Sequence, residues 1–217
     1  MVPAPPPRAK VAVLISGRGS NLGALLRAAA DPAYPAEIAL VMSNVPGAAG
    51  LDLAAHAGVT TRTIDHKFYD KDRTAHEAAI NAALHQAGIS IVCLAGYLRL
   101  LTPHLVDAWA GRMLNIHPSL LPAYPGLDTH ARALADGVKT HGCTVHLVTA
   151  GMDEGPILGQ AAVPVLPGDT EDTLAARVLA AEHQLYPQVL AQFVARGAAR
   201  PQPVAAEPLA QAGPHHL

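Results

Sequence analysis

Residues 11–42 read VAVLISGRGSNLGALLRAAADPAYPAEIALVM, and this stretch contains the repeating unit of the chain. The apolar run 11–15 has the length of a buried strand and is followed by a Gly/Ser loop. An Ala/Leu-rich helix is predicted over 22–30, and a second strand over 37–42. A strand, a helix and a further strand in this order predict a parallel pair of strands, with the helix packed on one face of the sheet.

The rest of the chain continues this alternation. Further strands are predicted over 60–64, 90–95, 112–116, 143–148 and 159–165, and further helices over 72–86 and 129–136. A long final helix is expected to begin at Asp169 or Thr170 and to be kinked or divided at Pro187. The elements together predict an open, mostly parallel sheet with helices on both faces, in which 143–148 runs parallel to 112–116. Ligands of such sheets bind beyond the carboxyl ends of the strands.

The composition indicates a globular domain. Half of the 217 residues are hydrophobic and 15% are charged, which excludes disorder throughout the chain. The net charge of −2 and the lack of a basic run argue against a nucleic acid or a membrane as partner, and no apolar stretch reaches the roughly 20 residues of a membrane span. We expect one domain over 10–200, between a Pro-rich tail over 1–9 and a C-terminal tail over 201–217. Cys93 and Cys143 are expected to be reduced core thiols of a cytoplasmic protein.

The loop 16–21, SGRGSN, joins the first strand to the first helix. Its glycines allow close approach of the backbone, and the free N–H groups of a helix N-terminus suit a phosphate. The dinucleotide-binding pattern G-x-G-x-x-G fails, because Leu22 occupies the place of its third glycine. The usual acidic ribose ligand is also missing, since the second strand ends at Met42-Ser43-Asn44. We favour a monophosphate site at Gly19, Ser20 and Asn21; the alternative is a purely structural turn.

The segment 114–122, LNIHPSLLP, carries the strongest chemical signal. Alternate side chains of a strand share a face, so Asn115 and His117 are predicted to project together while Ile116 points into the core. Pro118 keeps His117 in an extended conformation at the end of the strand. An amide donor beside an imidazole suits stabilisation of an oxyanion together with proton transfer. The alternative, a structural histidine, is less favoured because of the paired asparagine.

The loop 149–156 could supply a third polar group. If the preceding strand is parallel to the Asn115 strand, this loop opens on the same crevice, and Asp153 can orient His117 and stabilise its protonated form. An ordinary turn aspartate is the alternative. His141 and His146 lie nearby, but the spacing of these residues fits no metal site, so we expect no metal.

Several motifs, taken in order along the chain, resemble those of the folate-dependent phosphoribosylglycinamide formyltransferases, also called glycinamide ribonucleotide transformylases. These motifs are SGRGSN at 16–21, LAGYLRLL at 94–101, LNIHPSLLP at 114–122, YPG at 124–126, HGCTVH at 141–146 and DEGP at 153–156. The resemblance implies a Rossmann-like formyltransferase fold. It also implies transfer of the formyl group of 10-formyltetrahydrofolate, a co-substrate, to the amine of glycinamide ribonucleotide in de novo purine synthesis. A formyltetrahydrofolate hydrolase, another formyltransferase such as the methionyl-tRNA enzyme, and a non-catalytic nucleotide-binding sensor are the alternatives.

The resemblance also assigns roles to individual residues. It implies a catalytic trio of Asn115, His117 and Asp153, a phosphate site at Gly19, Ser20 and Asn21, and contacts of Glu182 with the glycinamide or ribose part. It further implies that Leu98, Arg99, Leu100 and Leu101 line the pterin pocket together with Asn115, and that Arg73 meets the glutamate tail of the folate. Ala123 and Asp128 depart from the family pattern, which leaves the details of their loop open. The oligomeric state is open between a monomer and a homodimer.

Overall fold

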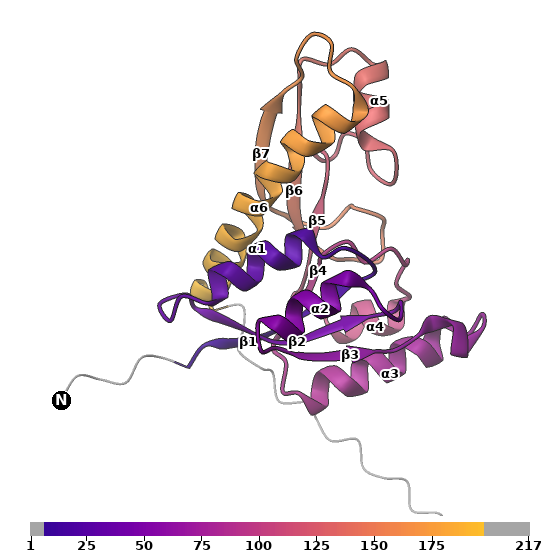
Figure 1. Cartoon of the computed structure of the whole chain (residues 1–217). Coiled ribbons are helices and arrows are strands. Elements are labelled where there is room, and N and C mark those ends of the chain that lie inside the picture. The colour runs from indigo at the N-terminus through magenta and orange to yellow at the C-terminus, as the bar shows by residue number, and fades with distance from the viewer. Residues whose placement is uncertain (1–6, 198–217) are drawn as a thin grey trace, which may run out of the picture.

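The computed structural model describes residues 7–197, and one sheet with the strand order β3-β2-β1-β4-β5-β6-β7 forms its centre (Figure 1). The strands are β1 (Ala9–Ile15), β2 (Ala36–Ser43), β3 (Thr60–Thr63), β4 (Ile91–Leu94), β5 (Met113–His117), β6 (Thr140–Leu147) and β7 (Ile157–Pro164). The pairs from β3 to β5 are parallel. The predicted tail over 201–217, and the part of the predicted N-terminal tail before Pro7, lie outside the described residues.

The direction of β6 differs from the prediction. β6 pairs antiparallel with β5, with Asn115 opposite His146 and His117 opposite Thr144, and β7 is antiparallel to β6. A parallel pair needs a crossover connection that returns the chain to the end of the sheet where the first strand began. The connection between β5 and β6 contains only the short helix α5 (Thr129–Ala135) and does not make this crossover. The chain instead turns back and enters β6 at the end where β5 finishes. The expected parallel orientation of 143–148 is therefore wrong, while the open, mostly parallel sheet is confirmed.

Helices cover both faces of the sheet, as predicted. The helices besides α5 are α1 (Ser20–Ala29), α2 (Ala49–His56), α3 (Arg73–Gln86), α4 (Pro103–Ala108) and α6 (Glu171–Ala195), with the 3₁₀ turn η1 (His66–Tyr69) before α3. One apolar core joins α1, α2 and α6 to the face of Val11 and Leu114. The second joins α3 and α4 to the face of Ala12 and Met113. The short elements α2, α4 and η1 were not predicted.

The last helix is continuous from Glu171 to Ala195 with Pro187 inside it, so the proline does not divide it. Thr170 caps its N-terminus through the Thr173 amide. Proline removes only one donor from the helix, and the buried side chains on either side of it anchor the helix to the sheet. These side chains are Leu185, Tyr186, Val189 and Leu190. The Tyr34 hydroxyl also donates to the Pro187 carbonyl over 2.7 Å.

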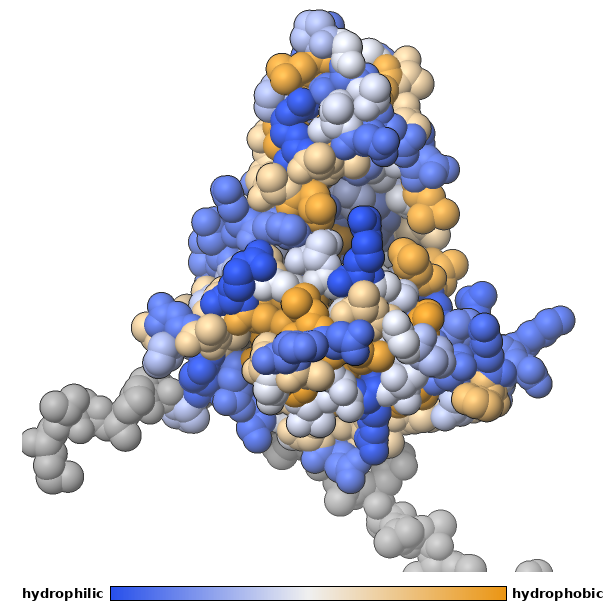
Figure 2. Space-filling model, viewed as in Figure 1, coloured by the Kyte–Doolittle hydropathy of each residue, from blue (hydrophilic) through white to orange (hydrophobic). Residues whose placement is uncertain are grey.

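Hydrophilic and apolar residues are interspersed on the face shown in Figure 2. Some large apolar side chains are nevertheless strongly exposed: Phe68, Leu98, Leu127 and Leu100. Within residues 7–197, no helix combines the length and the apolar character needed to cross a bilayer.

Candidate active site

Asn115 and His117 project from β5 to the same face, as the strand alternation predicts. Leu114 and Ile116 face the α6 side and belong to its core, so the two polar side chains face away from α6. Asn115 is half-buried and His117 is 6% exposed. Both side chains therefore project from a strand of the sheet, and little of the His117 ring is exposed to solvent.

Both ring nitrogens of His117 have a partner. Nε2 lies 2.9 Å from the carbonyl oxygen of Tyr124, and Nδ1 lies 3.4 Å from Oδ2 of Asp153. Because a carbonyl only accepts, Nε2 carries the hydrogen and donates it to Tyr124. Nδ1 is therefore the nitrogen that is free to take or give a proton.

Asp153 reaches His117 although β6 is antiparallel, because the loop after β6 folds back over the face of β5 and β6. Its backbone is left-handed, with φ 56°, and Oδ2 accepts from the Gly126 amide over 2.9 Å. Burial raises the pKa of Asp153, but His146, the Gly126 amide and His117 together bring this pKa below its ordinary value. The carboxylate is therefore ionised at neutral pH and faces the imidazole as an anion.

His146 belongs to this group, although no role was predicted for it. Its Nδ1 donates to the Leu147 carbonyl over 2.9 Å, while Nε2 lies 3.2 Å from Nδ2 of Asn115 and 3.6 Å from Oδ1 of Asp153. A neutral ring accepts from Asn115, and a protonated ring donates to Asp153. The signal in the sequence was parity, which puts Thr144 and His146 on one face of β6. The pairing of His146 with Asn115 follows from the antiparallel register, which was not predicted.

The Gly/Ser loop forms the N-terminus of α1. Gly19 has φ 74° and directly precedes the helix, whose N-terminus bonds to no side chain among the described residues. A Cβ at Gly19 would lie 2.8 Å from the Cα of Gly50 in α2, and the Gly50 amide donates to the Gly17 carbonyl over 3.0 Å. This crowding explains why glycine is required at positions 19 and 50. The exposed Ser20 hydroxyl and the first amides of α1 suit an anion.

Asn21 and Glu182 come together although they are far apart in the sequence. Nδ2 of Asn21 donates to Oε2 of Glu182 over 2.7 Å. Glu182 is 6% exposed within the buried side of α6, and burial raises its pKa against the opposing hydrogen bond from Asn21. Oδ1 of Asn21 is buried without a hydrogen-bond partner among the described residues. Such an acceptor beside a phosphate-type loop fits a polar ligand.

The segment 98–101 is exposed and is held at both ends. Leu98 is 79% exposed and Leu100 59%, which is unusual for leucines on a rigid loop. The Leu98 amide donates to Oγ of Ser16 over 2.9 Å. Ser16 directly precedes the Gly/Ser loop, so this bond links the segment to the predicted phosphate site.

Glu77 holds the other end of this segment and was missed by the sequence analysis. It is 2% exposed, and its carboxylate accepts from the amide and the hydroxyl of Thr102 over 2.7 and 2.6 Å. It also accepts from the Leu105 amide over 3.3 Å. Arg73 lies one helical turn earlier on the same face of α3 and is exposed. The sequence pattern that could have pointed to Glu77 is its i, i+4 spacing from Arg73, which puts both residues on one face of the helix.

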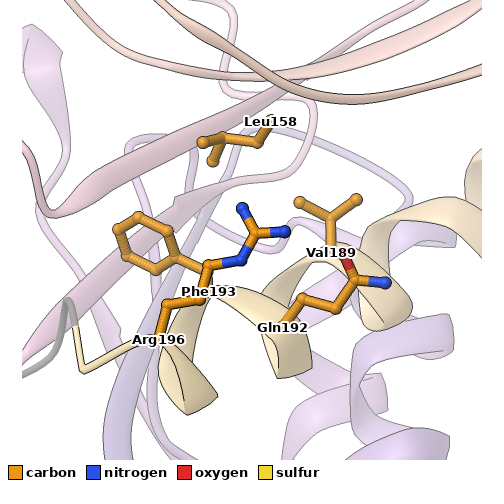
Figure 3. A pocket seen from close by; sticks show the side chains of 5 residues that line it. All are labelled: Leu158, Val189, Gln192, Phe193 and Arg196. Atoms are coloured by element: carbon orange, nitrogen blue, oxygen red, sulfur yellow. The ribbon is translucent and has the colours of Figure 1, made fainter.

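The strand register brings the predicted residues to one region. Leu14 pairs with Leu94 and Leu94 with Asn115, so the start of the phosphate-type loop lies two strand spacings, about 10 Å, from Asn115. By contrast, a small hollow between β7 and the end of α6 lies on the other face of the sheet (Figure 3). Leu158, Val189, Gln192, Phe193 and Arg196 line this hollow. It contains none of the predicted site residues.

Ala123 and Asp128 both lie in the loop between β5 and α5. The Ala123 carbonyl accepts from the Ser119 hydroxyl over 2.6 Å. Asp128 has φ 55° and precedes α5, but its side chain does not cap the helix. The contacts of His117 are with Tyr124 and Asp153, and neither Ala123 nor Asp128 takes part in them. Among residues 7–197, no group of three or more His, Cys, Asp or Glu side chains is arranged to hold a metal ion.

Comparison with known proteins agrees with this geometry. The sequence pattern described as "Formyl transferase" matches residues 9–190, and the chain belongs to the formyl transferase family. It is similar to the phosphoribosylglycinamide formyltransferase of Escherichia coli, with 44% identity over 183 residues, which cover 84% of this chain and 86% of that protein. The resemblance inferred from the motifs is confirmed.

Two further relatives extend the comparison. The crystal structure of phosphoribosylglycinamide formyltransferase from Brucella melitensis is 56% identical, with a TM-score of 0.83, and the match covers 87% of this chain and 97% of that one. The trifunctional purine biosynthetic protein adenosine-3 of Bos taurus is 50% identical over 195 residues, or 90% of this chain. This chain spans only 19% of the length of the Bos taurus protein.

Proposed function

We propose that this chain transfers the formyl group of 10-formyltetrahydrofolate to the primary amine of glycinamide ribonucleotide, a step of de novo purine synthesis. The observation that carries the proposal is the cluster of Asn115, His117 and Asp153, which lies at the same edge of the sheet as a helix N-terminus that suits an anion and an exposed apolar segment. The names of the relatives support the same reaction.

The amine nitrogen of glycinamide ribonucleotide attacks the formyl carbon, and the carbonyl electron pair moves onto oxygen. Nδ2 of Asn115 and the protonated Nδ1 of His117 then donate hydrogen bonds to this oxyanion, and such preorganised donors contribute about 3–4 kcal/mol each. The bond between carbon and N10 of the folate breaks as the carbonyl re-forms. Overall, the amine loses one proton and N10 gains one.

Asp153 supports this step by its charge. Its pKa lies below the ordinary value, so it stays ionised and stabilises the imidazolium of His117 rather than acting as a strong base. The role of Tyr124 is to fix which nitrogen reacts, because its carbonyl occupies Nε2. No covalent intermediate on the protein is required.

The ribonucleotide would reach Asn115 from the loop after β1, and the folate from the segment 98–101 after β4. The phosphate of glycinamide ribonucleotide would bind at Gly19, Ser20 and Asn21, with Glu182 toward the ribose or glycinamide part. Oδ1 of Asn21, which has no hydrogen-bond partner among residues 7–197, fits a donor on that substrate.

The pterin of the folate would lie against the segment 98–101 and Asn115. The exposed Leu98 and Leu100 fit a flat aromatic ring system. Arg73 would pair with the glutamate tail, since it is exposed on the face of α3 that holds this segment.

The proposal also covers the extent of the functional domain, its partners and its cellular compartment. We propose a single functional unit over 10–200 that takes two small molecules, with neither nucleic acid nor membrane as a partner. The described thiols Cys93 and Cys143 are both free and buried, which supports a reducing, cytoplasmic compartment. Burial raises the pKa of each to about 12, so neither serves as a nucleophile.

The test mixes purified protein with 10-formyltetrahydrofolate and follows loss of the formyl group with and without glycinamide ribonucleotide. Turnover that requires the amine is the expected result, with the formylated ribonucleotide as product. Turnover at the same rate without the amine would establish a hydrolase instead. Binding of the ribonucleotide without turnover would establish a nucleotide-binding sensor.

A further inference from the structure

One turn contacts both members of the His117–Asp153 pair. The Tyr124 carbonyl accepts from Nε2 of His117 over 2.9 Å, and the Gly126 amide donates to Oδ2 of Asp153 over 2.9 Å. The remaining nitrogen and this same oxygen, Nδ1 and Oδ2, lie 3.4 Å apart. The turn 124–127 therefore holds both the imidazole and the carboxylate, and with them the distance between the two groups.

Two side chains hold this turn against α5. The Arg132 guanidinium donates from Nη1 to the Pro125 carbonyl over 2.6 Å and to the Leu127 carbonyl over 3.3 Å. The Tyr124 hydroxyl donates to Oδ2 of Asp136 over 2.9 Å. The guanidinium also lies 5.3 Å from the centroid of the Tyr124 ring, within the range of a cation–π contact. None of these contacts involves an atom of the catalytic trio.

The backbone of Tyr124 shows why such support is needed. Its φ is 54°, in the left-handed region that bulky residues rarely adopt. A left-handed tyrosine persists only where its surroundings hold it in place. If the contacts with Arg132 and Asp136 are lost, the peptide can relax, and its carbonyl then leaves Nε2 of His117.

We propose that Arg132 and Tyr124 are positioning residues, which hold the turn 124–127 so that His117 presents Nδ1 to the formyl oxygen and keeps Nε2 on a carbonyl. Neither residue touches a reacting atom. The effect of the turn on the rate rests on the proposed function, whereas its effect on the ring of His117 does not.

Four titratable side chains lie near His117 and could change its protonation. They are Asp153 from the loop after β6, His146 and His141 from β6, and His130 from α5. Nε2 of His141 lies 3.2 Å from Nδ1 of His130, and burial lowers the pKa of His141 to about 4. His141 therefore stays neutral near neutral pH and does not compete for the charge of Asp153.

The experiment compares Arg132→Gln, Tyr124→Phe and the double variant with the wild type. Nitrogen NMR on protein labelled at histidine, recorded at a pH where the ring of His117 is neutral, reports its tautomer directly, without substrate. The assignment of the His117 signals comes from the His117→Ala variant. We expect the Nε2–H tautomer in the wild type and a mixture of tautomers in Arg132→Gln and in the double variant. Arg132 and the Tyr124–Asp136 bond are exposed, so the variants should fold.

Turnover gives the second measurement. A lost hydrogen bond of this kind corresponds to roughly threefold to tenfold in kcat, with the KM of both substrates changed by less than about twofold. Arg177→Gln is the matched control, because Arg177 also binds a backbone carbonyl, that of Pro164, and a carboxylate, that of Asp169, but on α6. It should lower thermal stability and leave both the His117 tautomer and kcat unchanged.

The outcomes separate the two proposals. An unchanged tautomer together with wild-type kcat in the double variant would overturn the positioning role. A tautomer change in a protein whose wild type shows no transferase activity would support the positioning role and reject the proposed function. A fall in kcat with an unchanged tautomer would also overturn the proposal, because Arg132 and Tyr124 would then act by another route.

Discussion

Replacing Asp153 by Asn removes one half-buried negative charge near His117 and keeps the size of the side chain. Oδ2 of Asp153 lies 3.4 Å from Nδ1 of His117, and Oδ1 lies 3.6 Å from Nε2 of His146. The asparagine carbonyl can still accept from the Gly126 amide, so the loop keeps its anchor. The substitution therefore isolates the charge of this carboxylate from its other contacts.

The distance to His117 gives the size of the effect. Coulomb's law at an effective dielectric constant of about 20 gives about 5 kcal/mol for charges 3.4 Å apart, before desolvation is subtracted. Desolvation offsets much of this, and a net interaction of about 1.4–4 kcal/mol remains for such pairs. Turnover of Asp153→Asn should then fall by roughly 10²-fold, within the range of acid–base contributions. The KM of glycinamide ribonucleotide should change little, since the phosphate site proposed for it lies elsewhere, at Gly19, Ser20 and Asn21.

The same substitution should lower the thermal stability of the protein at neutral pH. The pKa of Asp153 lies below its ordinary value of 3.8, so the ionised carboxylate stabilises the fold above that pH. This stabilisation is lost as the pH falls through the lower, folded-state pKa. Asp153→Asn should accordingly melt below the wild type at neutral pH, and the difference should shrink in acid.

The assay measures turnover per folded molecule and melting temperature on the same preparation. Asp128→Asn is the control, because Asp128 is also left-handed, with φ 55°, and its side chain does not cap α5. It should leave turnover unchanged. A stability loss in Asp153→Asn with wild-type turnover per folded molecule would refute the reasoning and reduce Asp153 to a turn residue.

Three further substitutions test other parts of the site. His117→Ala should lower turnover by roughly 10²–10⁴-fold with an unchanged circular dichroism spectrum, and near-normal turnover would contradict its catalytic role. Burial raises the pKa of Glu182, so its charge destabilises the fold as the pH rises above the ordinary 4.5. Glu182→Gln should therefore melt higher at neutral pH, by about 2–4 °C for each kcal/mol relieved, with no gain in acid; melting scans across pH decide this. Glu77→Gln should raise the KM of the folate by roughly tenfold and change kcat less, because the segment 98–101 loses an anchor worth about 1–3 kcal/mol. Steady-state kinetics that showed an unchanged KM would exclude this role.

The sequence predicted the parts of the site that depend on local pattern. Strand parity placed Asn115 and His117 on one face, and Pro118 marked the end of β5. The contact of Asp153 with His117 was expected for the wrong reason, since the direction of β6 depends on whether its connection crosses the sheet. Apolar periodicity carries no information on that direction. The contact arises from the fold-back of the loop after β6.

Other features are visible only in three dimensions. Glu77 is a charged residue in a helix, a pattern typical of a solvated surface, and it is buried because α4 presents free amides to it. Glu182 was assigned by resemblance alone, and its burial depends on where α6 lies on the sheet. The short helix α2 (Ala49–His56) has too few residues for a clear helical period, so it was missed.

The bond between Asn21 and Glu182 joins the first helix to the last one. During synthesis, the N-terminal half of the sheet can form before α6 is made, so the proposed ribonucleotide site stays incomplete until the final helix docks. A ligand that binds across Asn21 and Glu182 recognises only the finished chain. At a concentration of about 100 Kd it would add about 2.7 kcal/mol to the stability of that state alone. Glycinamide ribonucleotide would then act as a folding probe that reports the arrival of α6 and leaves earlier intermediates unaffected.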